Sequence, residues 1–160
     1  MQRIGLGGGC HWCTEAVVQE LAGVTSAAQG FIASEPPQDS YSEAVDVMFD
    51  PDVLPLEALL EVHLRTHASQ SNHKMRGKYR SAVYVHSEAQ GLEVAHALAR
   101  LQHGFDAPLV TQVLRFVSFK PSDERFQNYA ARHRGGPFCA RYIDPKLDML
   151  RAQFGAFVRA

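Results

Sequence analysis

The sequence predicts an α+β fold, a ferredoxin-like two-layer sandwich with a mixed sheet and with additional C-terminal helices and a tail. Two observations support this class. Short apolar runs of strand character alternate with stretches of helical periodicity in the order β-α-β-β-α-β. The 160 residues also contain no internal repeat and no linker long enough to separate two cores. We therefore expect a single domain over residues 1–160.

The first six elements are delimited by glycine, proline and polar turn residues. Three glycines follow the first strand, Gly23 ends the first helix, and Pro36-Pro37 lies between the second and third strands. The expected elements are a strand at 3–6, a helix at 12–21, a hairpin of strands at 24–33 and 44–49, a helix at 56–64 and a strand at 80–86. The last strand is rich in β-branched and aromatic residues, which favours a central place in the sheet.

Beyond residue 86 the pattern predicts further elements. Ser87 is a suitable cap for the first of them, because its hydroxyl can accept from a free backbone N–H group. The further elements are a helix from Ser87 to about His103, a strand at 111–119 ending at Pro121, a helix from Ser122 to Gly135-Gly136-Pro137, and a terminal helix at 144–158.

The charge composition argues against two classes of partner. There are 16 Lys and Arg residues against 17 Asp and Glu residues, so no strong field attracts nucleic acid. No apolar run approaches the roughly 20 residues that cross a bilayer, so no membrane partner is expected. The N-terminus lacks the basic and apolar pattern of a secretory signal, and we expect a cytoplasmic protein.

Cys10 is the strongest candidate for a reactive residue. It follows a strand and three glycines, where the first turn of a helix presents unpaired N–H groups and the positive end of the helix dipole. Both lower the pKa of a thiol and favour the nucleophilic thiolate. From its position alone, the alternative is a buried structural cysteine.

Cys13 leaves two other functions open. A Cys-x-x-Cys pair at a helix start is typical of thiol-disulfide exchangers and also of soft-metal-binding modules. A metal module, however, gives Cys139 no task. His63 and His67 lie one helical turn apart, but no cysteine or carboxylate stands at ligand spacing, so we expect no metal site.

A series of motifs along most of the chain resembles the A-type peptide methionine sulfoxide reductases, with a loop shorter than is usual in that family. The motifs are Gly9-Cys10-x-Trp12-x-x-Glu15, Gly23-Val24 with Gly30, Glu43-Ala44-Val45 running into Phe49-Asp50-Pro51, Leu59 to His67, the strand from Lys78 to Tyr84, and Phe126-Gln127-Asn128-Tyr129. The resemblance implies an oxidoreductase that reduces methionine-S-sulfoxide, free or in peptides, to methionine.

The resemblance also implies the chemical roles. The Cys10 thiolate would attack the sulfoxide sulfur while Glu43, kept protonated by an apolar pocket, donates to the departing oxygen. Tyr79, and with it Tyr41, would hydrogen-bond that oxygen as negative charge builds on it.

Two residues beside the nucleophile would bind substrate. Trp12 would form an apolar wall against the methyl group of the substrate. His11 stands where the family usually has phenylalanine, so a polar ring replaces one apolar wall. A second departure lies in residues 71–77, which are basic where the family has an aspartate. These departures predict either a different way of orienting the substrate or a substrate other than peptide methionine sulfoxide.

The resemblance further implies how the enzyme is recycled. Attack leaves Cys10 as a sulfenic acid, with which a second thiol condenses to give a disulfide. The resolving thiol would be Cys139, in a tail whose glycines permit movement toward Cys10, and Cys13 is the possible alternative resolver. Thioredoxin or another dithiol would restore the thiols as an external electron donor, so no bound cofactor is implied.

Overall fold

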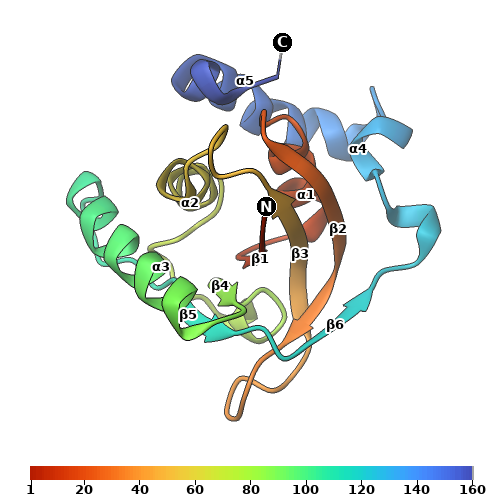
Figure 1. Cartoon of the computed structure of the whole chain (residues 1–160). Helices are drawn as coiled ribbons and strands as arrows, with labels where there is room; N and C mark the ends of the chain where they lie inside the picture. Colours follow the sequence, from red (N-terminus) through yellow and green to blue (C-terminus); the bar gives the residue numbers. More distant parts are fainter. Residues whose placement is uncertain (160) are drawn as a thin grey trace.

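The computed structural model describes residues 1–159, which form an α+β architecture around one six-stranded sheet (Figure 1). The strand order is β5-β4-β1-β3-β2-β6. Neighbouring strands are antiparallel except β4 and β5, which are parallel, so the expected mixed sheet is confirmed. The strands are β1 (Gln2–Gly7), β2 (Val24–Ala33), β3 (Ser42–Phe49), β4 (Ala82–Val85), β5 (Gln112–Arg115) and β6 (Ser118–Pro121).

The helices agree with the expected ones in the first two thirds of the chain. Ser87 caps its helix as expected, since its hydroxyl accepts from the backbone N–H of Gln90 at 3.1 Å. The helices are α1 (His11–Gln19), α2 (Leu56–Arg65), α3 (Glu88–Leu101), α4 (Tyr129–Arg132) and α5 (Asp144–Phe154), with short helical turns at Lys74–Gly77, Gln102–Gly104, Glu124–Phe126, Cys139–Ile143 and Gly155–Phe157.

Alternate residues of the inner strands face the helices. Ile4 and Leu6 of β1, and Val45 and Val47 of β3, are fully buried against apolar side chains of α1, α2, α3 and α5. This alternation follows from the two-residue period of a strand. The main core therefore fixes β1 against α1, and with them the turn that carries Cys10.

The opposite face of the sheet encloses a smaller apolar cluster around Ile32, Tyr84 and Phe116. Gly5 of β1 points into this cluster. A Cβ atom at Gly5 would lie 2.6 Å from Cδ1 of Ile32 and 2.9 Å from Cβ of Tyr84, which is closer than side chains pack. Glycine at this position lets the sheet curl tightly around the cluster.

The expected strand at 111–119 is wrong, because the chain forms two strands on opposite edges of the sheet. The backbone N–H of Phe116 still donates to the carbonyl of Val85, the last residue of β4, but that of Val117 donates to the carbonyl of Ala33 of β2. The curl brings the two edges close enough for this crossing (Figure 1). Phe116 and Phe119 both reach the inner cluster three residues apart, which one continuous strand does not allow.

The continuous helix expected from Ser122 is also wrong. Asn128 has a left-handed conformation with φ of 58°, and it separates the turn Glu124–Phe126 from the four residues of α4. Two groups of this segment bond to other elements. The backbone N–H of Asn128 donates to Glu15 of α1, and the side-chain oxygen of Gln127 accepts from the backbone N–H of Gln29 of β2. The terminal helix is confirmed as α5, although it ends at Phe154.

Candidate active site

The turn between β1 and α1 is fixed from several sides. Cys10 is the N-cap of α1, and its carbonyl accepts from the N–H groups of Cys13 and Thr14 at 3.1 and 3.3 Å. Nε2 of His63 donates to the carbonyl of Gly7 at 2.9 Å, and Arg76 donates to the carbonyl of Gly8 at 2.9 Å. These bonds fix the backbone of the glycine turn that carries Cys10.

The surroundings of Cys10 favour its thiolate. A hydrogen bond from the Cys13 thiol is the main cause that lowers the pKa of Cys10, and the backbone N–H of Trp12 adds to it. Burial and the nearby Glu43 act against this shift. The same hydrogen bond, with burial, raises the pKa of Cys13, so Cys13 keeps its proton. The expected nucleophile at the helix start is thus supported by a neighbour within the same turn.

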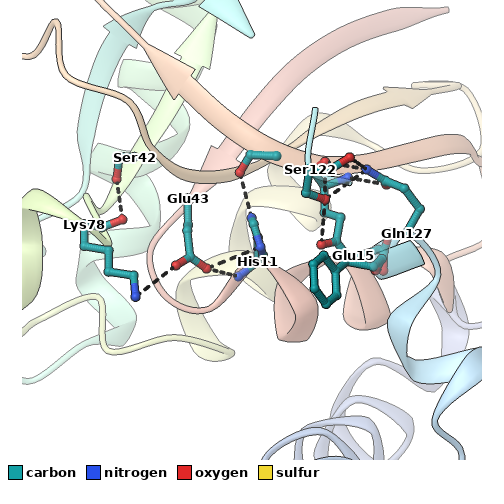
Figure 2. A network of polar contacts seen from close by, with 10 residues as sticks. His11, Glu15, Ser42, Glu43, Lys78, Ser122 and Gln127 are labelled. Carbon is teal, nitrogen blue, oxygen red and sulfur yellow. Dashed lines mark hydrogen bonds and ion pairs between the residues drawn. The ribbon is translucent and has the colours of Figure 1, made fainter. Parts of the chain in front are cut away.

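Glu43 lies at the start of β3, 7% exposed, beside the first residue of α1. Oε1 of Glu43 accepts from the backbone N–H of His11 at 3.2 Å. The ring nitrogen Nε2 of His11 lies 3.5 Å from the same oxygen. The ammonium of Lys78 lies 3.7 Å from Oε2 (Figure 2). The expected apolar pocket around Glu43 is therefore wrong, because a ring nitrogen and an ammonium flank the carboxyl group.

His11 is turned toward the sheet and is only 6% exposed. Its Nδ1 lies 2.7 Å from the carbonyl oxygen of Gly30 on β2, and its ring packs edge-on against Phe31 with 5.2 Å between the ring centroids. The interpretation of His11 as one wall of a substrate pocket remains a prediction. In the structure its polar atoms face Gly30 and Glu43.

The two tyrosines occupy different surroundings. The ammonium of Lys78 lies 5.1 Å from the centroid of the Tyr79 ring, so Tyr79 adjoins the cation that contacts Glu43. Tyr41 is 48% exposed, and its hydroxyl lies 2.7 Å from that of Ser118 at the start of β6. The structure thus brings Tyr79 to the edge of the site and leaves the Tyr41 hydroxyl bonded to β6.

Trp12 belongs to an aromatic cluster formed with the C-terminal part of the chain. Its ring stacks on Tyr129 with 4.0 Å between centroids and 4° between planes. Phe138 meets the ring edge-on at 5.2 Å, and Phe126 packs against it at 5.7 Å. Among residues 1–159, the buried Nε1 of Trp12 has no hydrogen-bond partner. Segments more than 100 residues apart therefore build this side of the site together.

The three cysteines share one apolar cluster. Cys13 and Cys139 are buried in it with Ala16 and Ile143, and Cys10 packs against it. All three are free thiols, and burial raises the pKa of Cys139. The glycine-containing tail that was expected to carry Cys139 forms a π-helical turn at this residue, Cys139–Ile143, which packs it against α1.

The comparison with known proteins decides the family. The family model described as "Peptide methionine sulfoxide reductase" matches residues 2–157. This chain belongs to that family. It is 32% identical to the reductase named MsrA of Polynucleobacter asymbioticus over 174 residues, covering 99% of this chain and 92% of the relative. It is 33% identical to that of Thermus thermophilus, covering 96% of each. The protein is therefore an oxidoreductase that reduces methionine sulfoxide.

Several solved structures show the same fold. The reduced form of Mxr1 from Saccharomyces cerevisiae superposes with a TM-score of 0.73 at 22% identity, over 84% of this chain and 87% of that one. The reductase of Corynebacterium diphtheriae gives 0.69 at 20% identity, over 84% and 76%. Mxr1 has also been solved in complex with Trx2, with a TM-score of 0.63 at 21% identity, over 78% and 82%.

Glu15 is a residue of the reductase to which the sequence assigned no role. It is fully buried, and its carboxylate accepts from the backbone N–H groups of Asn128 at 3.0 Å and Tyr129 at 3.1 Å, and from Gln29 at 3.0 Å. It therefore caps α4 from α1 and ties the aromatic cluster to the nucleophile helix. Its place four residues after His11, on the buried face of α1, was the available signal.

Lys78 was also missed as a site residue, and Figure 2 shows it reaching Glu43 from the side opposite His11.

The two histidines one turn apart on and after α2 form hydrogen bonds within the protein. Nε2 of His63 contacts the carbonyl of Gly7, and Nε2 of His67 contacts the hydroxyl of Ser81 at 2.8 Å. Within residues 1–159, no three His, Cys, Asp or Glu side chains gather at metal-binding range. In the same part of the chain, none of the helices has the length and apolar character to cross a membrane.

Proposed function

We propose that the protein reduces the S epimer of methionine sulfoxide, free or in peptides, by attack of the Cys10 thiolate on the sulfoxide sulfur. Glu43 gives a proton to the oxygen. One thiolate, one sulfoxide and one proton yield one sulfenic acid on Cys10 and one thioether, so two electrons pass from the cysteine to the substrate sulfur. The observation that carries this proposal is the hydrogen bond from the backbone N–H of His11, the residue after Cys10, to Oε1 of Glu43.

The remaining site residues act on the substrate. Tyr79, next to Lys78, hydrogen-bonds the sulfoxide oxygen as negative charge builds on it. Trp12 supplies the apolar contact for the methyl group, and His11 helps to line the site. Tyr41 fits this role less well than Tyr79, because its hydroxyl is bonded to Ser118.

Cys139 is the proposed resolving thiol. It attacks the sulfur of the Cys10 sulfenic acid, which forms the disulfide and releases water. Its place in one cluster with Cys10 and Cys13 supports this step. Cys13 is the alternative resolver, but the two residues lie in one helical turn, where an unstrained bridge has little room.

A thioredoxin-like protein is the proposed external reductant. The complex of Mxr1 with Trx2 supports this, as does a cavity of about 520 Å³ beside Cys139 lined by Arg134, Asp144 and Arg151 among others. Thiol-disulfide exchange alone restores the enzyme, so the cycle needs no bound cofactor.

The ferredoxin-like fold class also stays a prediction. It is supported by the strand order β4-β1-β3-β2, in which neighbouring strands are antiparallel.

A single-turnover experiment tests the residue roles. We expect reduced wild type without external thiol to convert one equivalent of (S)-methionine sulfoxide and to yield a Cys10–Cys139 disulfide in peptide mass spectra. Cys139→Ser should stop at a sulfenic acid on Cys10 that dimedone traps. Glu43→Gln should slow sulfenic acid formation about 100-fold or more, as expected for loss of a general acid, while the exposed Glu35→Gln should not. A sulfenic acid on another cysteine, or a Cys10–Cys13 disulfide, would reject the corresponding role.

A further inference from the structure

We propose that His11 and Glu43 hold one proton between them and act as a single acid toward the sulfoxide oxygen. His11 is then a positioning residue that stores the proton which Glu43 delivers. This inference rests on the proposed function, because it concerns the proton that Glu43 gives to the substrate.

The hydrogen bond to β2 fixes the tautomer of His11. Nδ1 lies 2.7 Å from the carbonyl oxygen of Gly30, which can only accept, so Nδ1 carries a hydrogen. The other ring nitrogen, Nε2, lies 3.5 Å from Oε1 of Glu43. Without a proton at this contact, lone pairs of nitrogen and oxygen would face each other. A proton on either atom turns the repulsion into an attraction.

Burial makes this proton hard to replace by solvent. His11 and Glu43 are 6% and 7% exposed, and an unpaired polar group in such surroundings is destabilising. The backbone N–H of His11 already serves Oε1, so one residue of α1 contacts the carboxyl group through both its main chain and its ring (Figure 2). Main chain and ring together hold the carboxyl group beside the nucleophile.

The charged neighbours of the pair come from two segments. Cys10, as a thiolate, precedes His11 on α1, and Lys78 places its ammonium 3.7 Å from Oε2 of Glu43. Strand β2 contributes the Gly30 carbonyl and the Phe31 ring, neither of which titrates. Lys78 favours the carboxylate and so moves the proton toward His11, while the thiolate favours retention of the proton by the pair.

One stored proton is what the reaction consumes. The thiolate, the sulfoxide and one proton give the sulfenic acid and methionine, and disulfide formation then releases water without a further proton from outside. After transfer, Glu43 is a carboxylate and His11 is neutral. The pair regains one proton from solvent before the next cycle. A lone carboxyl group would have to keep that proton by itself near neutral pH.

The test is the pH profile of kcat/KM for the S epimer, which reports on sulfenic acid formation and not on recycling. The variants are His11→Phe, which keeps a ring against Phe31, and His11→Gln, which keeps a hydrogen-bond donor but does not titrate. Coupled groups lose their shared proton in a step that belongs to the pair. We therefore expect both variants to move the alkaline limb down by about one pH unit, equivalent to a roughly tenfold loss of kcat/KM above the limb. The readout is the position of the limb, because the height of the plateau on its acid side also reports any change in substrate contacts at the site.

The outcomes separate this inference from the proposed function. An unmoved alkaline limb in both variants overturns the shared proton, and so does a wild-type profile for His11→Gln alone, which would mean that hydrogen bonding suffices. Absence of turnover by wild type at every pH would instead reject the proposed function. An NMR titration of wild type keeps the test valid if the variants misfold. The ring nitrogens of His11 and the carboxyl carbon of Glu43 should change at one common pH midpoint, and two separate midpoints would contradict the pair.

Discussion

At the scale of single residues, the reactivity of Cys10 depends on Cys13 as much as on the helix start. The Cys13 thiol donates to the sulfur of Cys10, and this bond is the main cause of the lowered pKa of Cys10. A lowered pKa means that the thiolate persists at a pH where an ordinary cysteine is protonated. Cys13 therefore has a task in the site even if Cys139 resolves the sulfenic acid.

We predict that Cys13→Ala slows alkylation of Cys10 by iodoacetamide at pH 7 about tenfold, the order of one hydrogen bond to a charged acceptor. The midpoint of the alkylation profile should move to higher pH, because the variant has lost the donor that stabilises the thiolate. Cys13→Ser is the matched control, since a hydroxyl still donates. Equal rates in wild type and Cys13→Ala would show that Cys13 does not set the reactivity of Cys10.

At the scale of elements, α1 carries both the nucleophile and the anchor for the C-terminal segment. Glu15 accepts two backbone N–H groups at the start of α4 and a side-chain amide from β2. Hydrogen bonds to a buried carboxylate contribute about 1.5–3 kcal/mol each, so this anchor outweighs the weak helical tendency of a four-residue helix.

We predict that Glu15→Gln releases the segment that carries Tyr129 and Cys139, because an amide group turns a donor toward the backbone N–H groups. Formation of the Cys10–Cys139 disulfide should slow about tenfold or more, while sulfenic acid formation should change less. Rapid-quench mass spectrometry in one turnover separates the two steps. Glu124→Gln, an exposed change in the same segment, serves as control. If disulfide formation were as fast in Glu15→Gln as in this control, the anchoring role would be wrong.

The hydrogen bond between His63 of α2 and Gly7 of the glycine turn makes the stability of the fold depend on pH. Burial lowers the pKa of His63 to about 4, and its Nε2 donates to Gly7. The unfolded chain takes up a proton at His63 below about pH 6.5, whereas the folded chain does so only near pH 4, so stability falls as the pH drops through this window.

We predict that the free energy of unfolding falls by about 2 kcal/mol more in wild type than in His63→Gln when the pH is lowered from 7 to 5. Glutamine keeps an amide donor for Gly7 but takes up no proton. Urea unfolding at the two pH values measures the difference. The same pH dependence in both proteins would mean that His63 does not titrate on unfolding.

At the scale of the whole molecule, the sequence predicted what local patterns determine. The strands and helices up to residue 101, the Ser87 cap and the position of Cys10 at a helix start all depend on neighbouring residues. Three features depend on the curl of the sheet and on contacts between distant segments: the division of β5 from β6, the break at Asn128, and the packing of Cys139 against α1. No local pattern encodes these features.

The same distinction holds for the site. Cys10 is recognisable from its turn, and Glu43 only from the family motif. The ring of His11 becomes a site residue because the register of β3 against β2 pairs Glu43 with Phe31, next to the carbonyl that binds His11. Lys78 becomes one because its carbonyl accepts from the backbone N–H of Glu43 at 2.9 Å. The prediction of an apolar pocket failed because the imidazole of His11 and the ammonium of Lys78 come from positions 32 and 35 residues away from Glu43 in the sequence.

The measurement that tests the central claim most directly is turnover of the two separated epimers of a protected methionine sulfoxide with dithiothreitol. We expect wild type to reduce the S epimer over many turnovers and to leave the R epimer unchanged. Cys10→Ser should reduce neither. Lack of S-epimer turnover by wild type, or undiminished turnover by Cys10→Ser, would contradict the assignment of Cys10 as the nucleophile.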